Sequence, residues 1–398
     1  MADNNENKVL NVPLLRFPEF TDEWKESVLS DFVERVKRKN KNNLCKLPLT
    51  ISAQYGLVDQ ISFFNKVIAS ENMSNYYLLH KGDFAYNKSY SSEYPWGAIK
   101  RLDCYEQGTL YSVYICFKPY SHVSSDFLTH YFETSKWHQG ISEIAVEGAR
   151  NHGLLNVGIQ DFFETRHCLP QSLLEQEKIA KFLNLIEERI ATQNKIIEDL
   201  KKLKSAIIHR CYSSQTNMIP LSELLKQCSD RNRSGSDLQV LSVSNKYGFI
   251  AQSDQFEDRE VASDDTSNYK VVKKGMFAYN PARINVGSIA LYEMDSNGIV
   301  SPMYVCFTTK SELLPSYLKY YFASQTFKHE MYKRLEGSVR LCLTFEELCN
   351  IEIHLPSIEQ QKNISKYISK IENNLSLVDS IFSKYQQQRR YLLSQMFI

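Results

Sequence analysis

The chain has 398 residues, of which 43% are hydrophobic and 12% aromatic, and its formal net charge is +1. A chain of this length and composition can bury more than one hydrophobic core, so we expect two or three domains and no extensive disorder. The balanced charge excludes attraction to nucleic acid through the field of the whole protein. A nucleic-acid partner would therefore need local basic surfaces.

Nine cysteines are scattered along the chain without a C-x-x-C pair, which indicates reduced thiols in a cytoplasmic protein and favours no metal site. His167 and Cys168 are adjacent soft ligands, but we interpret them as packing residues. The polar N-terminus lacks the apolar core of a signal peptide. No apolar run reaches the roughly 18 residues that would span a membrane, so we expect a soluble protein.

The first region, residues 12–168, begins with a basic stripe and continues as a mixture of short strands and helices. The stripe comprises Arg35, Lys37, Arg38, Lys39 and Lys41. Such runs are more often merely solvated than bound to phosphate. Later landmarks are Tyr55-Gly56, KGDFAYN at 81–87, Gly97, YICF at 114–117, a helical pattern over 125–137, Tyr131-Phe132 and Glu147-Gly148.

A long helix is predicted over 172–212, where it would span about 60 Å. Ser172 and Glu175 have the spacing of a capping box, and apolar residues then recur alternately every four and three residues, which is a heptad seam. The seam comprises Ile179, Leu183, Ile186, Ile190, Gln193, Ile197, Leu200, Lys204 and Ile207.

The second region, residues 217–354, repeats the landmarks of the first in the same order. They are Tyr247-Gly248, KGMFAYN at 274–280, Gly287, YVCF at 304–307, Tyr321-Phe322 and Glu336-Gly337. Strands are predicted over 240–243, 275–279, 288–292 and 303–307, with a helix over 315–334. The repeat indicates a duplicated α/β domain.

The last region, residues 355–398, repeats the long helix. Ser357 and Gln360 again have capping-box spacing, and the seam returns 185 positions later without a slip, with its basic residue at the same step. It comprises Ile364, Ile368, Ile371, Leu375, Val378, Phe382, Tyr385, Arg389 and Leu392. We expect these seams to pack the two helices together.

We find no catalytic apparatus in the sequence. The glycine patterns of nucleotide cradles do not occur among the 14 glycines. Asn280-Pro281-Ala282-Arg283 is only a partial match to the N-P-P-[YF] motif of adenine methyltransferases. Glu175 with Lys178 could suggest a nuclease, but a solvated or dipole-matching role at a helix start is the better interpretation.

Several segments together resemble the specificity subunit of type I restriction-modification enzymes, from about Val12 to Ile398. They are LRFPEFTDEWKESVLSDF at 15–32, the KGDFAYN and KGMFAYN segments, LPQSLLEQEKIAKFL at 169–183, the looser LPSIEQQKNISKYI at 355–368, and LKKLKSAII at 200–208.

The resemblance implies two tandem α/β target recognition domains, separated and followed by long helices that form an antiparallel coiled coil, with a pseudo-two-fold internal repeat. The expected divisions are recognition domain 1 at 12–168, spacer helix 1 at 169–213, recognition domain 2 at 217–354 and spacer helix 2 at 355–398. Each domain would read one half of a bipartite, asymmetric DNA site.

The resemblance further implies a non-catalytic subunit that binds double-stranded DNA and docks two modification subunits, which methylate adenine, together with restriction subunits. No cofactor is expected on this chain. S-adenosylmethionine, ATP and Mg²⁺ would be used by the partner subunits, and no membrane is involved.

Candidate DNA-binding residues follow the repeated AYN strands, where the two copies begin to differ, and the repeated Glu-Gly pairs. Readout of base edges favours Arg, Lys, Asn and Gln on loops. The alternative for the asparagines is that they close turns. Tyr86 and Tyr279 are expected in the core. The candidates are Asn87, Lys88, Tyr90, Trp96, Arg150, Asn151 and His152 in the first copy, and Asn280, Arg283, Asn285 and Arg340 in the second.

Apolar residues outside the seams predict a surface for the modification subunits. They are Phe182, Leu185, Ile196, Leu203, Leu377 and Ile381. Two other functions stay open: a self-contained methyltransferase or nuclease with fused recognition domains, and a coiled-coil interaction protein without a DNA role.

Overall fold

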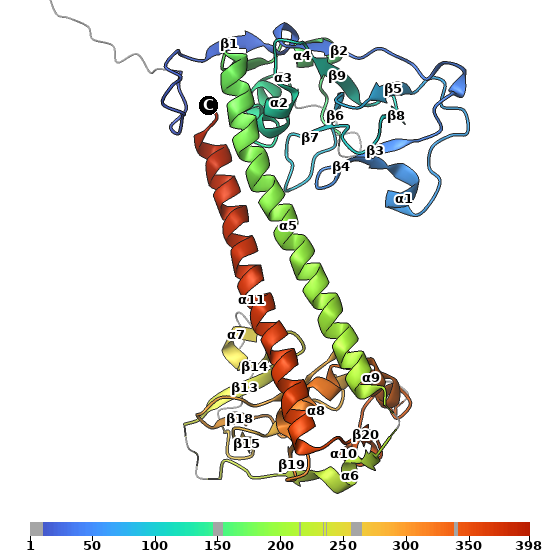
Figure 1. The fold of residues 1–398 in the computed structure, drawn as a ribbon, viewed down its shortest axis with the longest axis vertical. Helices are drawn as coiled ribbons and strands as arrows, with labels where there is room; N and C mark the ends of the chain where they lie inside the picture. The colour runs from blue at the N-terminus through green and yellow to red at the C-terminus, as the bar shows by residue number, and fades with distance from the viewer. Residues whose placement is uncertain are drawn as a thin grey trace, which may run out of the picture. The chain divides into compact units, whose positions relative to one another are not determined.

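The structure is a computed structural model that describes residues 11–145, 154–214, 216–233, 235, 237–255, 265–337 and 341–398. The chain divides into two compact units. The first contains the residues up to Thr192 together with Phe382–Ile398, and the second contains Gln193–Ile381. Each unit holds one mixed α/β region and a stretch of both long helices (Figure 1). No helix in the described ranges is both long and apolar enough to cross a membrane.

The first unit is built on an antiparallel four-stranded sheet in the order β2 (Val33–Arg35), β9 (Ile115–Pro119), β6 (Phe84–Asn87), β7 (Ala98–Arg101). Three two-stranded sheets accompany it: β1 (Lys25–Val28) with β10 (Arg166–Leu169), β3 (Leu49–Ser52) with β4 (Gly56–Asp59), and β5 (Tyr77–His80) with β8 (Gln107–Leu110). Its helices are η1 (Leu29–Asp31), η2 (Lys41–Asn43), α1 (Gln60–Phe64), α2 (Ser125–Tyr131), α3 (His138–Ile144) and α4 (Ile159–Phe163).

The second unit repeats this plan. Its antiparallel sheet has the order β12 (Leu225–Cys228), β19 (Val305–Thr309), β16 (Phe277–Tyr279), β17 (Ile289–Leu291), and β11 (Met218–Pro220) pairs with β20 (Glu352–His354). A further sheet has the order β14 (Gly248–Ala251), β13 (Gln239–Ser244), β18 (Gly298–Val300), β15 (Lys270–Val272). Its helices are α6 (Leu221–Leu224), α7 (Gln252–Gln255), η3 (Ile284–Val286), α8 (Pro315–Phe322), α9 (Gln325–Tyr332) and α10 (Phe345–Cys349).

The strand pairings confirm the duplication that the sequence predicted. Phe84 lies opposite Phe117 in the first sheet, and Phe277 lies opposite Phe307 in the second. The rings stack with centroids 5.4 Å and 5.2 Å apart. The copies differ in the second sheet: β13 pairs in parallel with β18, whereas an isolated bridge between Pro48 and Thr109 takes that place in the first unit.

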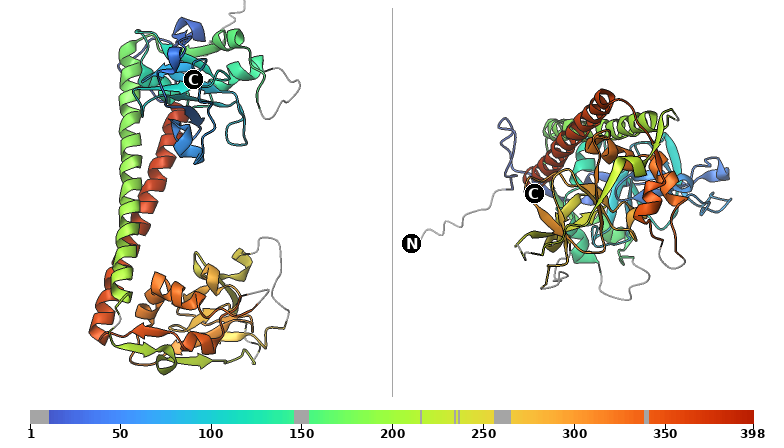
Figure 2. Two further views of the ribbon diagram at one scale, coloured as in Figure 1. Left: turned by 90° about the vertical axis from the view of Figure 1, so that its right-hand side faces the viewer. Right: turned by 90° about the horizontal axis from the view of Figure 1, so that it is seen from below.

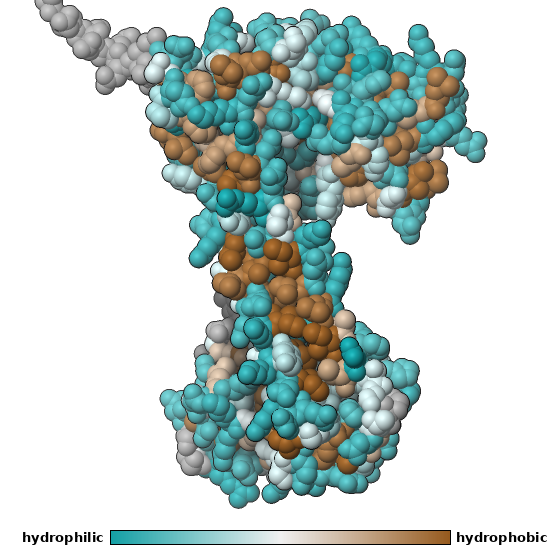
Figure 3. Space-filling view, in the orientation of Figure 1, coloured by the Kyte–Doolittle hydropathy of each residue, from teal (hydrophilic) through white to brown (hydrophobic). Residues whose placement is uncertain are grey.

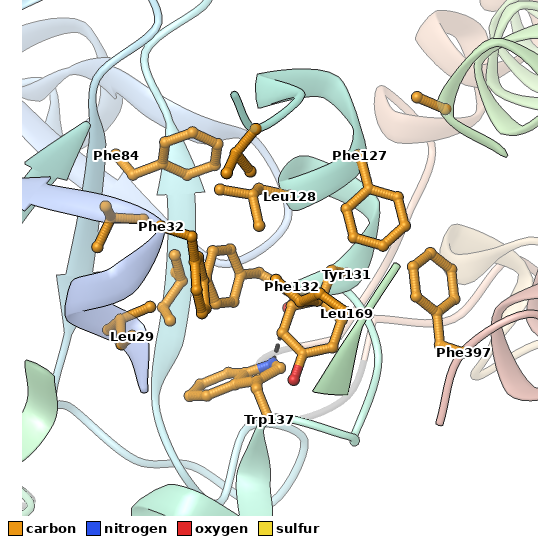
Figure 4. Packing of buried hydrophobic residues seen from close by; sticks show 14 of the residues in the cluster. Leu29, Phe32, Phe84, Phe127, Leu128, Tyr131, Phe132, Trp137, Leu169 and Phe397 are labelled. Carbon is orange, nitrogen blue, oxygen red and sulfur yellow. Dashed lines mark hydrogen bonds between the residues drawn. The ribbon is translucent and has the colours of Figure 1, made fainter. Parts of the chain in front are cut away.

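The core of the first unit is rich in aromatic rings packed between the sheet, α2 and the start of the long helix (Figure 4). Trp137 is 2% exposed, and its indole nitrogen donates to the Phe132 carbonyl at 3.0 Å. Burying such rings with their polar atoms satisfied is a large source of stability. Phe397, at the end of the chain, belongs to the same core.

The helices predicted over 125–137 and 315–334 were too long, because the first region forms only the short helix α2 and the second forms the two short helices α8 and α9. The second region breaks between α8 and α9, where the buried Ser324 side chain accepts from the Phe327 amide at 3.0 Å and caps α9. Serine is one of the preferred residues at the N-cap of a helix. The first region ends α2 at Tyr131, and α3 begins only at His138.

The two long helices are α5 (Leu173–Tyr212) and α11 (Ile358–Gln395). Every seam position is buried or half-buried, so the heptad prediction is confirmed. The capping box is complete at α11, where Ser357 and Gln360 exchange hydrogen bonds of 3.0 Å and 3.3 Å. At α5 it is only half formed: the Glu175 amide donates to Ser172 at 3.4 Å, but the Glu175 carboxylate pairs with Arg16 and Trp24 instead.

The basic residues in the two seams are neutralised by the facing helix. Lys204 pairs with Glu372 at 2.6 Å, and Arg389 pairs with Glu187. From Glu187 to Lys204 the partners advance 17 positions along α5, while from Arg389 to Glu372 they retreat 17 along α11. The helices are therefore antiparallel neighbours, as a coiled coil of this type requires.

The end of each long helix packs into the unit that it reaches, and the sheets of each unit lie to one side of its helical stretches (Figure 2). The Tyr212 ring lies 4.7 Å from Tyr317 in the second unit. The Phe397 ring lies 5.3 Å from Phe127 in the first. These contacts are equivalent in the repeat, so both ends of the helix pair are anchored in the same way.

Candidate nucleic-acid interface

The strands that end in AYN are held in place by their tyrosines, as the sequence predicted. Tyr86 and Tyr279 are fully buried. The Tyr86 hydroxyl donates to the Trp96 carbonyl at 2.9 Å, and the Tyr279 hydroxyl donates to the Leu343 carbonyl at 3.2 Å. Burial raises the pKa of both phenols well above the usual value. Each tyrosine therefore ties the strand end to a more distant loop.

Asn87 and Asn280 close turns, which was the alternative to a DNA contact. The Asn87 side-chain oxygen accepts from the Ser89 amide at 3.0 Å, and that of Asn280 accepts from the Ala282 amide at 3.1 Å. Each is an Asx turn, a common role for asparagine after a strand. Asn280 is 9% exposed and its amide nitrogen faces the Met303 sulfur at 3.7 Å, so it has little surface for a base.

The first copy continues through residues 88–97. Lys88 is half-buried, with its ammonium 3.4 Å from the Val157 carbonyl, and Tyr90 is 40% exposed. Trp96 packs partly against the core of the unit. Gly97 has φ +80°, and a Cβ there would lie 2.2 Å from the Asn87 carbonyl oxygen, so only glycine lets β7 return so close to β6. Lys88 and Tyr90 are thus the accessible candidates.

The second copy is shorter and presents an arginine. Arg283 is exposed at the N-cap of η3, and among the described residues no side chain pairs with its guanidinium. The backbone around it is held firmly, because its carbonyl accepts from the Ser288 amide at 3.1 Å and its amide donates to Asn280. Asn285 is half-buried, and its carbonyl accepts from the Tyr332 hydroxyl at 3.4 Å. An unpaired guanidinium on a rigid turn is suited to forked recognition of a base edge or phosphate.

The second group of candidates, Arg150, Asn151, His152 and Arg340, lies outside the described residues. The segments that follow them in the chain do return to the AYN turns. The Leu155 amide donates to the Lys88 carbonyl at 2.9 Å in the first unit, and the Leu343 amide donates to the Pro281 carbonyl at 3.1 Å in the second. Both copies thus bring the same two variable stretches together, a contact that no local sequence signal could show.

The basic stripe is divided between structural and accessible cations. Arg38 pairs with the buried Asp83, and Lys39 lies 3.7 Å from the centroid of the Tyr77 ring. Burial raises the pKa of Asp83, while its hydrogen bond from the His80 amide and the charge of Arg38 oppose this rise. Lys37 is exposed, and Lys118, which sequence reasoning missed, joins it beside a shallow hollow of about 330 Å³. β9 places Lys118 opposite Glu34 on the edge strand β2, where the stripe begins at Arg35, and Lys118 pairs with Glu34 at 3.1 Å.

The apolar residues expected to bind partners differ in how far their side chains are exposed to solvent. Leu185, Ile196, Leu203 and Leu377 are 50%, 38%, 49% and 60% exposed. Ile381 is half-buried, and Phe182 packs edge-on against Phe17 with centroids 5.9 Å apart, so it is largely covered by its own chain. Figure 3 shows apolar side chains gathered along the exposed stretch of the long helices.

Glu175 is not solvated, and this corrects one half of the expectation from sequence; the other half, a match to the helix dipole, agrees with its place in the first turn of α5. It is 2% exposed, and both carboxylate oxygens receive hydrogen bonds from Arg16, at 2.7 Å and 2.9 Å. The sequence could not show this because the partner lies 159 positions away. His167 is buried and Cys168 is half-buried against the core, so both are packing residues, as expected. Within the described ranges, no cluster of His, Cys, Asp and Glu could hold a metal ion.

This geometry defines a class of protein in which a duplicated α/β domain packs on paired antiparallel helices and has variable polar turns at equivalent places. Residues 232–381 match the family model of the type I restriction modification DNA specificity domain. A comparison with curated proteins finds no match.

Solved structures extend the likeness to nearly the whole chain. The S subunit of a type I restriction-modification system from M. genitalium is 15% identical, with a TM-score of 0.58 over 97% of this chain and 99% of that chain. A chain from a structure of type I R-M system assembly and conformational transition is 16% identical, with a TM-score of 0.53 over 94% and 97%. Residues 232–381 are thus similar to a type I specificity domain, the fold is that of S subunits, and the expected resemblance is confirmed.

Proposed function

We propose that this chain is the sequence-specific DNA-binding subunit of a cytoplasmic type I restriction-modification complex, with each unit reading one half of a bipartite site. The observation that carries the proposal is the repeat itself. Two copies of one scaffold keep the buried tyrosine and the Asx turn, and then present different side chains, the half-buried Lys88 and the exposed Tyr90 in one and the exposed Arg283 in the other. Two different half-sites would need this combination.

The chain itself supplies recognition and assembly, and the chemistry belongs to its partners. Leu185, Ile196, Leu203 and Leu377 would contribute to docking two modification subunits, since large exposed apolar side chains on paired helices favour association. Restriction subunits would join that core. S-adenosylmethionine, ATP and Mg²⁺ would be bound by these partners, and the present chain would act as a non-catalytic adaptor.

Selection from a random pool of double-stranded DNA, with the chain assembled on its modification subunit, tests this function. The proposal predicts enrichment of two defined blocks separated by an undefined spacer of constant length. The logarithm of the affinity for that site should fall linearly with the logarithm of the salt concentration. Enrichment of one continuous block would contradict bipartite reading, and failure of an assembled complex to enrich any sequence would favour an interaction protein. Binding of S-adenosylmethionine by the chain alone would favour a fused methyltransferase.

A further inference from the structure

The first unit binds a segment of its own chain, residues 11–20, along the first turns of α5. Three residues on one face of that helix receive it: Glu175 pairs with Arg16, Lys178 pairs with Glu19, and Phe182 packs on Phe17. The Leu15 amide also donates to the Gln395 carbonyl at the end of α11, at 3.0 Å. The groove between the start of one long helix and the end of the other is thus filled.

The second unit contains the equivalent groove, between the start of α11 and the end of α5. The repeat relates the long helices by 185 positions, so the residues equivalent to Glu175, Lys178 and Phe182 are Gln360, Asn363 and Tyr367. All three line a hollow of about 720 Å³. Arg210, which is equivalent to Gln395, lines it from the end of α5.

The second groove is open because the segment that leads into β11 is short. Only residues 213–217 join α5 to β11, so no counterpart of the segment 11–20 exists. The amides of Leu29 and Leu221 make equivalent bonds, to Thr165 and Ile351, which aligns Trp24 with Thr216. A small threonine therefore replaces the tryptophan that closes the first groove, and Tyr367 is left 67% exposed.

The charges of the two grooves also differ, and the difference indicates which kind of ligand the second groove binds. The acidic Glu175 and basic Lys178 are replaced by the neutral Gln360 and Asn363, so an arginine like Arg16 would lose its partner. None of the described residues that line the hollow is acidic, and Arg210 contributes a guanidinium. Burial of an unpaired charge is unfavourable, whereas a carboxylate opposite Arg210 would gain a charge-assisted hydrogen bond.

We infer that this groove docks a peptide segment of a partner polypeptide, which places a large apolar side chain against Ile364 and Tyr367 and a carboxylate toward Arg210. One such segment binds per chain, because the equivalent groove of the first unit is already filled. The inference goes beyond DNA reading and does not depend on it.

Fluorescence anisotropy with the full chain and two labelled peptides tests the inference. One peptide has the sequence of residues 12–23, and the other has glutamate at the position of Arg16. The second peptide should bind about tenfold more tightly, because its carboxylate can reach Arg210 while arginine meets only neutral amides. Arg210→Glu should reverse this preference, and Tyr367→Ala should weaken the binding of the second peptide by about tenfold or more.

Tyr391→Ala is the matched control, since Tyr391 is 59% exposed on the same helix but does not line the groove. It should leave the affinity unchanged, and circular dichroism should show that every variant is folded. Equal binding of the two peptides, absence of binding, or a preference that Arg210→Glu does not alter would overturn the inference. Tighter binding of the unaltered peptide would instead assign the groove to the N-terminal segment of a second copy.

Discussion

At the scale of single residues, the two copies use the same side chains to build a turn and different side chains to present on it. Tyr86 and Tyr279 are interchangeable in position, burial and hydrogen bonding to a distant carbonyl. Arg283 is an exposed cation, whereas Lys88 in the first copy is half-buried near Val157. A substitution of Arg283 should therefore change DNA recognition without changing the stability of the fold.

Arg283→Ala should weaken discrimination at one half-site by about 1–3 kcal/mol for each bidentate base contact that is lost. The other half-site should be read as before, because the substitution is exposed and confined to one unit. Competition binding with DNA altered in one block at a time measures both effects, with Lys319→Ala as a control cation elsewhere on the second unit. An unchanged preference at both blocks would reject the assignment.

The buried ion pair between Arg16 and Glu175 should be a major contributor to the stability of the first unit. Arg16→Ala leaves a carboxylate that is 3% exposed without its partner, which typically costs about 3 kcal/mol or more in the free energy of unfolding. Lys178→Ala removes an exposed pair with Glu19 and should cost about 1 kcal/mol or less. Urea denaturation measures both, and equal losses would show that burial of the first pair is not decisive.

His167 should make the first unit sensitive to acid. Its ring nitrogens lie 2.8 Å from the Tyr131 and Thr165 hydroxyls, and burial lowers its pKa from 6.5 to about 3. In this pH range the His167 side chain therefore binds a proton in the unfolded chain but not in the folded chain. The free energy of unfolding falls as the pH drops from about 6.5 toward 3.

Between pH 7 and pH 5 this proton should cost about 2 kcal/mol. Urea denaturation at both pH values should show a smaller loss for His167→Gln than for the wild type, whose other buried histidine, His130, titrates in both proteins. Identical losses for the two proteins would mean that His167 is protonated in the folded state.

At the scale of elements, a buried glutamine joins each long helix to its unit. The Gln176 oxygen accepts from the Ser124 amide at 2.8 Å, and its nitrogen donates to the Pro170 carbonyl at 2.9 Å. Gln361 accepts from the Leu314 amide and donates to the Pro356 carbonyl, both at 2.9 Å. The same residue thus ties the start of the long helix to the N-terminus of a preceding short helix, α2 or α8, in both copies.

Gln361→Leu should destabilise the second unit by about 2–4 kcal/mol, because it leaves buried backbone groups without partners. Gln360→Ala, on the exposed side of the same turn, loses only the capping interaction and should cost about 1 kcal/mol. Thermal denaturation with the two variants compares them directly. A Gln361→Leu protein as stable as Gln360→Ala would contradict the role of this buried amide.

The elements show where sequence reasoning works and where it fails. The heptad seams were predictable because a long periodic pattern occurs twice without a slip, and the structure buries or half-buries every position. The helix over 315–334 was predicted without its break, because Ser324 has helical neighbours and reveals its capping role only once it is buried. Local patterns also could not show that Glu175 pairs with Arg16.

At the scale of the whole molecule, the repeat could be predicted from ordered landmarks, and with it the resemblance to specificity subunits. The candidate site was less predictable. The sequence indicated the turns after the AYN strands, but both asparagines form the turn rather than presenting a free amide. The pairing of Leu155 with Lys88 and of Leu343 with Pro281 joins stretches that are more than 60 positions apart, which no local pattern encodes.

The central claim is that two units read two halves of one DNA site. Single-molecule sequencing of adenine methylation in cells that express the modification subunit, with this chain, with Arg283→Ala, or without the chain, tests it most directly. We predict a bipartite methylated motif that disappears without the chain and loses definition in one block alone with Arg283→Ala. Methylation that is unchanged when the chain is absent, with the modification subunit present and active, would contradict the account.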